Sequence, residues 1–157
     1  MKPLAPPQSA IDSLHDEIKQ LVEAARTRAA AQVNQALVLT YWQIGKLIKT
    51  QLLETDRAQY GAGVLQQLAT RLSSDFGQGF SYSSLTRMAK FYVFLPTSEI
   101  VATLSQQLSW SHFVELIKHD EPIKRDFYIN LCVNGRWSVR TLRERTDGML
   151  FERTAIA

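Results

Sequence analysis

Residues 108–145, LSWSHFVELIKHDEPIKRDFYINLCVNGRWSVRTLRER, decide the fold that we predict for this chain. Apolar residues recur there at three- and four-residue steps in three short runs, which indicates three helices. Turn signals separate the runs: Pro122 suits the first turn of a helix, and Asn134-Gly135 marks a turn. The last run is basic, with arginines at Arg136, Arg140, Arg143 and Arg145. Short helices that end in a basic one are typical of a helix-turn-helix unit, here residues 108–147, whose last helix enters a DNA groove.

The same segment predicts where its helices begin and which side chains face inward. Ser109 or Ser111 is expected to cap the first helix and Ser138 the last, because serine hydroxyls accept the free backbone N–H groups of a first turn. The middle helix is expected over residues 122–132. Side chains expected to face the core are Ile123, Phe127, Leu131, Val139 and Leu142, with Tyr128 as a further candidate.

A second, similar helical pair is predicted over residues 60–96. A polar break containing Gly61 and Gly63, interpreted as turn glycines, precedes a helix over residues 64–76. Gly77 and Gly79 end that helix, and another runs to Pro96 with Ser81 or Ser83 as its N-cap. Hydroxyl and basic side chains near the start and on the outer face of this second helix are candidates for DNA contact: Tyr82, Ser83, Ser84, Thr86, Arg87 and Lys90.

Residues 9–54 form a long helical segment in this interpretation. No glycine or proline occurs between residues 8 and 44, and the alanine-rich middle favours one long helix or two nearly collinear ones. Gly45 interrupts the apolar second part, where a close helix crossing is expected. The apolar positions need cover, so a homodimer through residues 10–50 is a hypothesis.

The remaining segments carry weaker signals, and no run alternates with period two, so we predict an all-α fold. Prolines make residues 1–8 a disordered tail. Residues 97–107 are a linker or a short helix, and residues 148–157 are expected to begin a linker.

Composition limits the classes of protein to consider. With 157 residues, 45% hydrophobic and 21% charged, the chain suits one globular body. Eighteen basic against fifteen acidic residues give a net charge of +3, so only local clustering argues for a polyanionic partner. A single cysteine, Cys132, excludes an internal disulfide, and no signal peptide or membrane-length apolar run occurs. We expect a cytoplasmic protein without membrane contact.

Several phrases together resemble a known family. They are LTYWQIGKLI (39–48), YGAGVLQQLATRLSSDFGQGFSYSSLTRMAKFY (60–92), LSWSHFVELI (108–117), RDFYINLCVNGRWSVRTLRER (125–145) and MLFERTA (149–155). Their order is similar to the N-terminal domain of YhcG-type bacterial proteins, which join a helical domain to a C-terminal nuclease domain of the PD-(D/E)xK class. The resemblance implies a winged-helix or helix-turn-helix DNA-binding region that precedes a Mg²⁺-dependent nuclease. No catalytic residue of that nuclease has a counterpart among residues 1–157.

The sequence gives only weak support for catalytic or metal-binding residues. Glu17-Ile18-Lys19 resembles an acid-x-lysine motif but lies on a predicted helix, without the upstream acid or the strand pair that would hold Mg²⁺. His112 and His119 lie two helical turns apart, yet zinc needs three or four ligands and Cys132 is remote. Cys132 lies in an apolar run without an orienting acid, which indicates a buried inert thiol. We therefore expect no enzyme, no cofactor and no small-molecule substrate within this chain.

Two functions remain open at this point. The first is a DNA-binding domain that positions nucleic acid for a nuclease, with contacts from the arginines of residues 136–145 and from the helix that starts near Tyr82. The alternative is a helical oligomerisation or protein-interaction module without nucleic-acid contact. Trp110 and Trp137 are interpreted as core anchors under both hypotheses.

Overall fold

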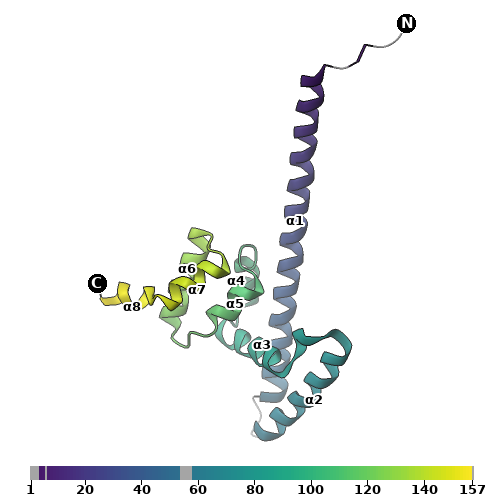
Figure 1. Cartoon of the computed structure of the whole chain (residues 1–157). Helices are drawn as coiled ribbons and strands as arrows, with labels where there is room; N and C mark the ends of the chain where they lie inside the picture. Colours follow the sequence, from purple (N-terminus) through teal and green to yellow (C-terminus); the bar gives the residue numbers. More distant parts are fainter. Residues whose placement is uncertain (1–3, 6, 54–57, 157) are drawn as a thin grey trace. The chain divides into compact units, whose positions relative to one another are not determined.

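The computed structural model describes residues 4, 5, 7–53 and 58–156, of which 53, 58, 59, 155 and 156 are described by their backbone alone. All regular elements among these residues are helical, which confirms the all-α prediction there (Figure 1). In chain order they are α1 (Gln8–Ile48), a π-helical turn η1 (Lys49–Leu53), α2 (Ala58–Phe76), a 3-10 turn η2 (Gln78–Phe80), α3 (Tyr82–Phe94), α4 (Ser98–Leu104), α5 (Trp110–Leu116), α6 (Pro122–Gly135), α7 (Val139–Asp147) and α8 (Leu150–Ile156). A wing is built from strands, and the described residues contain none, so the winged-helix expectation is not met there.

The chain divides into two compact units, residues 1–33 and residues 34–157. Helix α1 is one unbroken helix of 41 residues, which is the first of the two arrangements predicted from the absence of glycine and proline between residues 8 and 44. The first unit contains its start, where every described side chain is exposed. The second unit contains the rest of α1 and all the other helices. Within it, α1 buries one face through Val38, Trp42, Gly45 and Ile48.

Two hydrophobic clusters form the core of the second unit. The smaller cluster joins the end of α1 to α2 and α3 through Ile48, Leu65, Ala69, Leu85, Met88 and Ala89. The larger one joins α1 and α3 to the helices that follow, and its buried members include Val38, Trp42, Phe91, Val101, Phe113, Tyr128 and Leu142. Trp110 and Trp137 pack against the larger cluster, which confirms their interpretation as core anchors.

The predicted close crossing occurs where Gly45 of α1 meets α3. A Cβ atom added at Gly45 would overlap the backbone carbonyl of Met88. Two helix backbones approach this closely only where one of them lacks a side chain. The glycine therefore fixes the distance at which α1 and α3 pack.

Polar side chains of α1 fix the region between α3 and α5. The Asn34 side-chain amide donates to two backbone carbonyls, those of Ser105 at 2.9 Å and Leu108 at 3.0 Å. The Gln35 side-chain amide donates to the backbone carbonyl of Ala102 at 2.8 Å. The Trp42 indole N–H donates to the Leu95 carbonyl at 2.7 Å, just after α3. Carbonyls at a helix end lack partners in their own helix, so these bonds satisfy groups that would otherwise need water.

The element boundaries confirm some predictions and correct others. Ser81, Ser109 and Ser138 each accept a backbone N–H as N-caps. Gly61 and Gly63 were predicted to lie in a turn, but both lie inside α2, where a helix tolerates glycine at a cost of about 1 kcal/mol. Residues 97–107 include α4, and α8 lies where a linker was expected. Of the expected tail, residues 1–3 and 6 lie outside the described residues, and Gln8 already begins α1.

The inward face of α6 differs from the prediction. Ile123 is 75% exposed, whereas Arg125, Tyr128, Ile129 and Cys132 are buried. These four residues follow the i, i+3, i+4, i+7 spacing of a helix face, so the helix is rotated relative to the face proposed from Ile123 and Leu131. Because one of the four inward residues is the charged Arg125, apolar periodicity did not predict this face.

No helix in the described part of the chain combines the length and apolarity that crossing a membrane requires.

Candidate nucleic-acid interface

Helix α7 carries most of the arginines singled out in the sequence. The Ser138 hydroxyl accepts the Thr141 N–H at 3.1 Å and so begins the helix. Leu142 is fully buried and holds α7 on the larger hydrophobic cluster. Because Arg140, Arg143 and Arg145 lie off the Leu142 face, all three are exposed.

Two of these arginines already contact carboxylates. The Arg140 Nε lies 3.2 Å from Glu144 Oε1 on the same helix, with side chains 89% and 63% exposed. The Arg143 Nε lies 2.9 Å from Glu115 Oε1 of α5, and Glu115 also accepts from the Lys118 ammonium at 3.1 Å. The exposed Arg140–Glu144 pair contributes about 0–1 kcal/mol, so a phosphate group is able to replace its carboxylate, whereas the Glu115 carboxylate is only 12% exposed and is held more firmly.

Glu115 is the acidic centre of this arrangement. Burial alone would raise the pKa of its carboxyl, but hydrogen bonds from Arg143 and Lys118 outweigh burial and hold the pKa below its usual value. The carboxylate is therefore charged near neutral pH and offsets part of the basic charge around it. Sequence reasoning missed Glu115, since no local pattern links it to an arginine 28 residues further along the chain.

The turn before α7 presents Arg136 and the ring of Trp137, and Arg145 of α7 lies near that ring. Arg136 follows α6 in the left-handed region, with φ of 50°, and its side chain is exposed. The Arg145 guanidinium lies 5.9 Å from the centre of the Trp137 ring. The turn is anchored from α5, because His112 Nε2 lies 2.7 Å from the Trp137 carbonyl. His112 Nδ1 accepts the Ser109 N–H at 3.0 Å, so the ring proton resides on Nε2 and donates to Trp137.

Helix α3 presents the second set of predicted contact residues, with mixed results. Tyr82, Ser83 and Arg87 are exposed, and Arg87 pairs with no carboxylate among the described residues. The Ser84 hydroxyl accepts from Ser81 at 3.1 Å, and Thr86 donates to the Tyr82 carbonyl at 2.8 Å, so both hydroxyls serve the helix itself. The aromatic second half of α3 packs inward through Phe91, as predicted.

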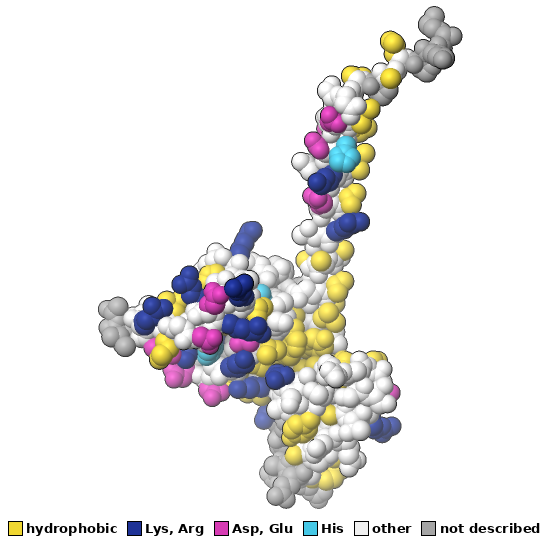
Figure 2. Space-filling model, viewed as in Figure 1, with side chains coloured by type: hydrophobic (Ala, Val, Ile, Leu, Met, Phe, Trp, Pro, Cys, Tyr) yellow, Lys and Arg dark blue, Asp and Glu magenta, His cyan; other side chains and the backbone are white. Residues whose placement is uncertain are grey.

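Ion pairs connect the surfaces of α3 and α7 within the second unit. The Lys90 ammonium of α3 lies 3.4 Å from Asp120 Oδ1, in the segment between α5 and α6. Arg143 and Lys118 meet at Glu115, which lies in the last turn of α5, two residues before that segment. Figure 2 shows Lys and Arg side chains gathered over α3, α5 and α7, with acidic side chains between them. We use the name basic face for the exposed and half-exposed basic residues of α3, of α7 and of the segments that flank α6, which are Arg87, Lys90, Lys118, Arg136, Arg140, Arg143 and Arg145.

Arg125, by contrast, is a structural residue. It is 7% exposed, its guanidinium lies 4.3 Å from the centre of the Phe94 ring, and it donates to the His119 carbonyl at 3.1 Å. None of the candidate sites predicted from the sequence includes Arg125. Its role is to join α3 to the segment before α6.

The titratable residues considered for metal or nucleophile chemistry are separated. His119 is buried and stacks on Tyr128 with ring centres 5.1 Å apart, and burial, together with the charge of Lys124, lowers its pKa. Burial raises the pKa of the Cys132 thiol to about 11, which makes the thiolate a minor species. Among the described residues, no group of three or more His, Cys, Asp or Glu is placed to hold a metal ion. The donor set for the Mg²⁺ that the family resemblance implies is thus not formed by these residues.

Comparison with known proteins supports the sequence resemblance. The curated protein named "Putative nuclease YhcG" of Escherichia coli (strain K12) is 28% identical over an alignment that covers 92% of this chain. The alignment covers 46% of that relative, so the chain spans about half of its length. No solved structure matches the chain. The model of the DUF1016 N-terminal domain matches residues 17–153, and the chain therefore belongs to the DUF1016 N-terminal domain family.

Proposed function

We propose that the second unit binds DNA through the basic face and positions it for a nuclease segment of a longer protein. The observation that carries the proposal is that two helices chosen separately from the sequence, α3 and α7, each carry a basic residue that pairs with α5 or with the segment directly after it, through Lys90–Asp120 and Arg143–Glu115. The relative named as a nuclease supplies the context, since an enzyme of that class must hold nucleic acid.

Local geometry favours α7 as the helix nearest the DNA. Only three residues, 136–138, separate α6 from α7, which is the length of connection typical of helix-turn-helix pairs. The first turn of α7 carries Arg140, and recognition helices contact base edges with their N-terminal residues. Arginine also suits bidentate contact with phosphate or guanine.

Replacing Arg140 and Arg143 together with alanine is expected to weaken binding to a short random-sequence duplex by on the order of tenfold at low salt. Each lost phosphate contact should also lower the slope of log affinity against log salt concentration by about 0.9. Fluorescence anisotropy over a series of salt concentrations measures both quantities. A single strand of the same length, titrated in parallel, reports whether the face prefers the double helix.

The matched control is the double variant Arg71→Ala, Arg153→Ala, which removes the same charge from exposed positions on α2 and α8. Its affinity should stay within about twofold of the original chain, because binding depends on where the charge lies. Equal losses of duplex affinity in both variants would mean that binding depends on the net charge of the chain and not on the basic face. No binding of the unchanged chain at about 50 mM salt would instead favour the interaction module without nucleic-acid contact.

Glu115→Gln is expected to act in the opposite direction and tighten DNA binding by about threefold to tenfold. The substitution removes a negative charge from the basic face and frees Arg143 and Lys118 while keeping the size of the side chain. The same anisotropy titration measures the effect, with Glu99→Gln on α4 as the control for loss of one exposed carboxylate. Unchanged or weaker binding would place the DNA away from Glu115.

A further inference from the structure

The first unit presents an apolar stripe along one side of α1. Ile11, Leu14, Ile18, Leu21 and Val22 are 44%, 57%, 51%, 70% and 44% exposed. At 100° per residue these five positions fall within an arc of about 100°, which is the width of a helix face that normally packs against another element. The stripe continues with Ala25 and Ala29. A surface of this kind on a regular helix marks an interaction site.

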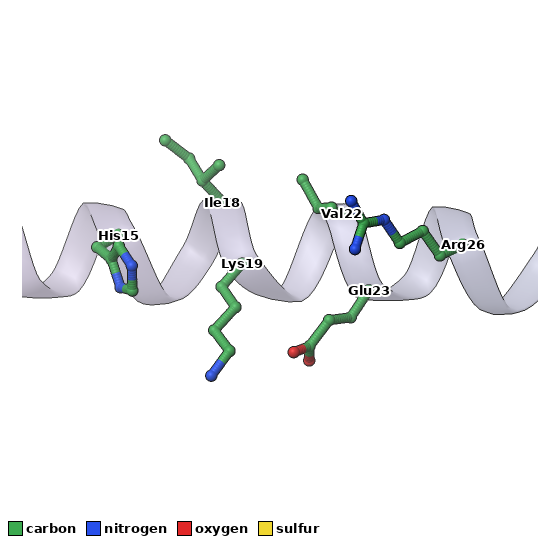
Figure 3. Close-up of a pocket in the computed structure, with 6 residues that line it drawn as sticks. All are labelled: His15, Ile18, Lys19, Val22, Glu23 and Arg26. Carbon is green, nitrogen blue, oxygen red and sulfur yellow. The ribbon is translucent and has the colours of Figure 1, made fainter.

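The stripe has a definite boundary with the polar side of the helix. Figure 3 shows Ile18 and Val22 projecting from one side of α1, and Lys19 and Glu23 from the other. The hollow at these positions is lined by residues of this helix alone, His15, Ile18, Lys19, Val22, Glu23 and Arg26, so it has one wall and cannot enclose a small molecule. Its shape fits the ridge of a second helix.

Charges along the segment indicate what that second helix is. Three of the four acidic residues of this segment lie in its first half, at Asp12, Asp16 and Glu17, with Glu23 in the second half, and both arginines lie in the second half, at Arg26 and Arg28. Asp12 and Arg26 are 14 residues apart, close to four helical turns, so they occupy the same flank of the stripe. An antiparallel pair of identical segments centred near Lys19 brings Asp12 of each copy beside Arg26 of the other.

We propose that residues 11–29 of α1 pair with the same segment of a second copy as an antiparallel two-helix interface. A two-fold interface requires a self-complementary surface, and this segment has a self-complementary apolar face and charge pattern. A parallel pair in register would bring the acidic first halves of the two copies level with each other, with Asp12 near Glu17 of the other copy, which places like charges together. The two Lys19 residues meet at the centre of the antiparallel pair, where their flexible stems let the ammonium groups turn toward solvent.

Sedimentation equilibrium of the whole chain tests the pairing. We expect a monomer–dimer equilibrium, with Ile18→Glu raising the dissociation constant by more than about thirtyfold, as for a central interface residue. Thr27→Glu adds the same charge on the opposite side of the helix and should change the constant by less than about twofold. All described side chains of this unit are exposed, so neither variant removes a packing contact within one chain, and circular dichroism at a concentration where the original chain is monomeric should give the same helix content for all three chains.

Charge reversal tests the orientation. Asp12→Arg and Arg26→Asp should each weaken the dimer by about fivefold, because each turns two attractive pairs into repulsive ones, and mixing the two variants should restore association as a heterodimer. A parallel pair predicts little change for either variant alone, which would overturn the antiparallel arrangement. A chain that stays monomeric at all concentrations, or a dimer insensitive to Ile18→Glu, would overturn the interface itself. Duplex affinity per chain at low protein concentration should be unaffected by Ile18→Glu, so this proposal and DNA binding fail independently.

Discussion

Replacing Gly45 with alanine is expected to lower the free energy of unfolding of the second unit by about 3 kcal/mol. The added methyl group would occupy the position of the Met88 carbonyl, and a backbone atom cannot move aside as the tip of a side chain can. Helices α1 and α3 would have to separate, which would loosen the smaller hydrophobic cluster around Leu85 and Met88. Urea unfolding followed by circular dichroism measures the change.

The control for this prediction is the same substitution in a different helix. Gly63 lies in α2 with no atom within 4 Å of an added Cβ. Alanine there should stabilise the fold by about 0.5–1 kcal/mol, because it restricts the unfolded chain and favours helix. If both variants shift stability in the same direction, the close crossing at Gly45 is not what determines the effect.

Arg125→Ala is expected to cost about 3 kcal/mol, the second large effect. The substitution removes a buried guanidinium from the face of Phe94 and leaves the His119 carbonyl without its donor. Arg125→Lys keeps the charge but not the planar group that stacks on the ring, so it should recover only part of the loss. The midpoint of urea unfolding should therefore be highest for the original chain, lower for Arg125→Lys and lowest for Arg125→Ala.

Ile123→Ala serves as the matched test of which face of α6 is inward. The side chain is 75% exposed, so its truncation should change stability by less than about 0.5 kcal/mol. The apolar pattern of the sequence predicts the reverse order, with Ile123 important and Arg125 dispensable. A larger loss for Ile123→Ala than for Arg125→Ala would restore that pattern and contradict the structure.

These two residues show why part of the fold was predictable and part was not. Capping serines, the proline that begins α6 and the glycine-free run of α1 act through bonds within a few residues, and all three predictions are confirmed. The rotation of α6 depends instead on Phe94, which lies 31 residues before Arg125 and supplies the ring that makes a buried arginine acceptable. Contacts of that range leave no periodic signal in the sequence.

The candidate site divides in the same way. Arg140, Arg143 and Arg145 were predicted from their clustering on one short helix, and their exposure follows from the burial of Leu142. The carboxylate that pairs with Arg143 comes from another helix and was not predictable. Whether the nine candidate residues contact DNA stays a prediction: Tyr82, Ser83, Ser84, Arg87, Lys90, Arg136, Arg140, Arg143 and Arg145.

The hydrogen bonds from the Asn34 and Gln35 side chains to carbonyls at the end of α4 have a consequence for the helix that carries them. Among the described residues they are the first tertiary hydrogen bonds that α1 makes along its length, and they coincide with the boundary between the two units at residue 34. Before this point, opening a helical turn breaks only local bonds, so fraying costs little. Beyond it, the same backbone opens only when the core of the second unit opens. One unbroken helix therefore contains two levels of local stability, and the proposed pairing through residues 11–29 would raise the lower one.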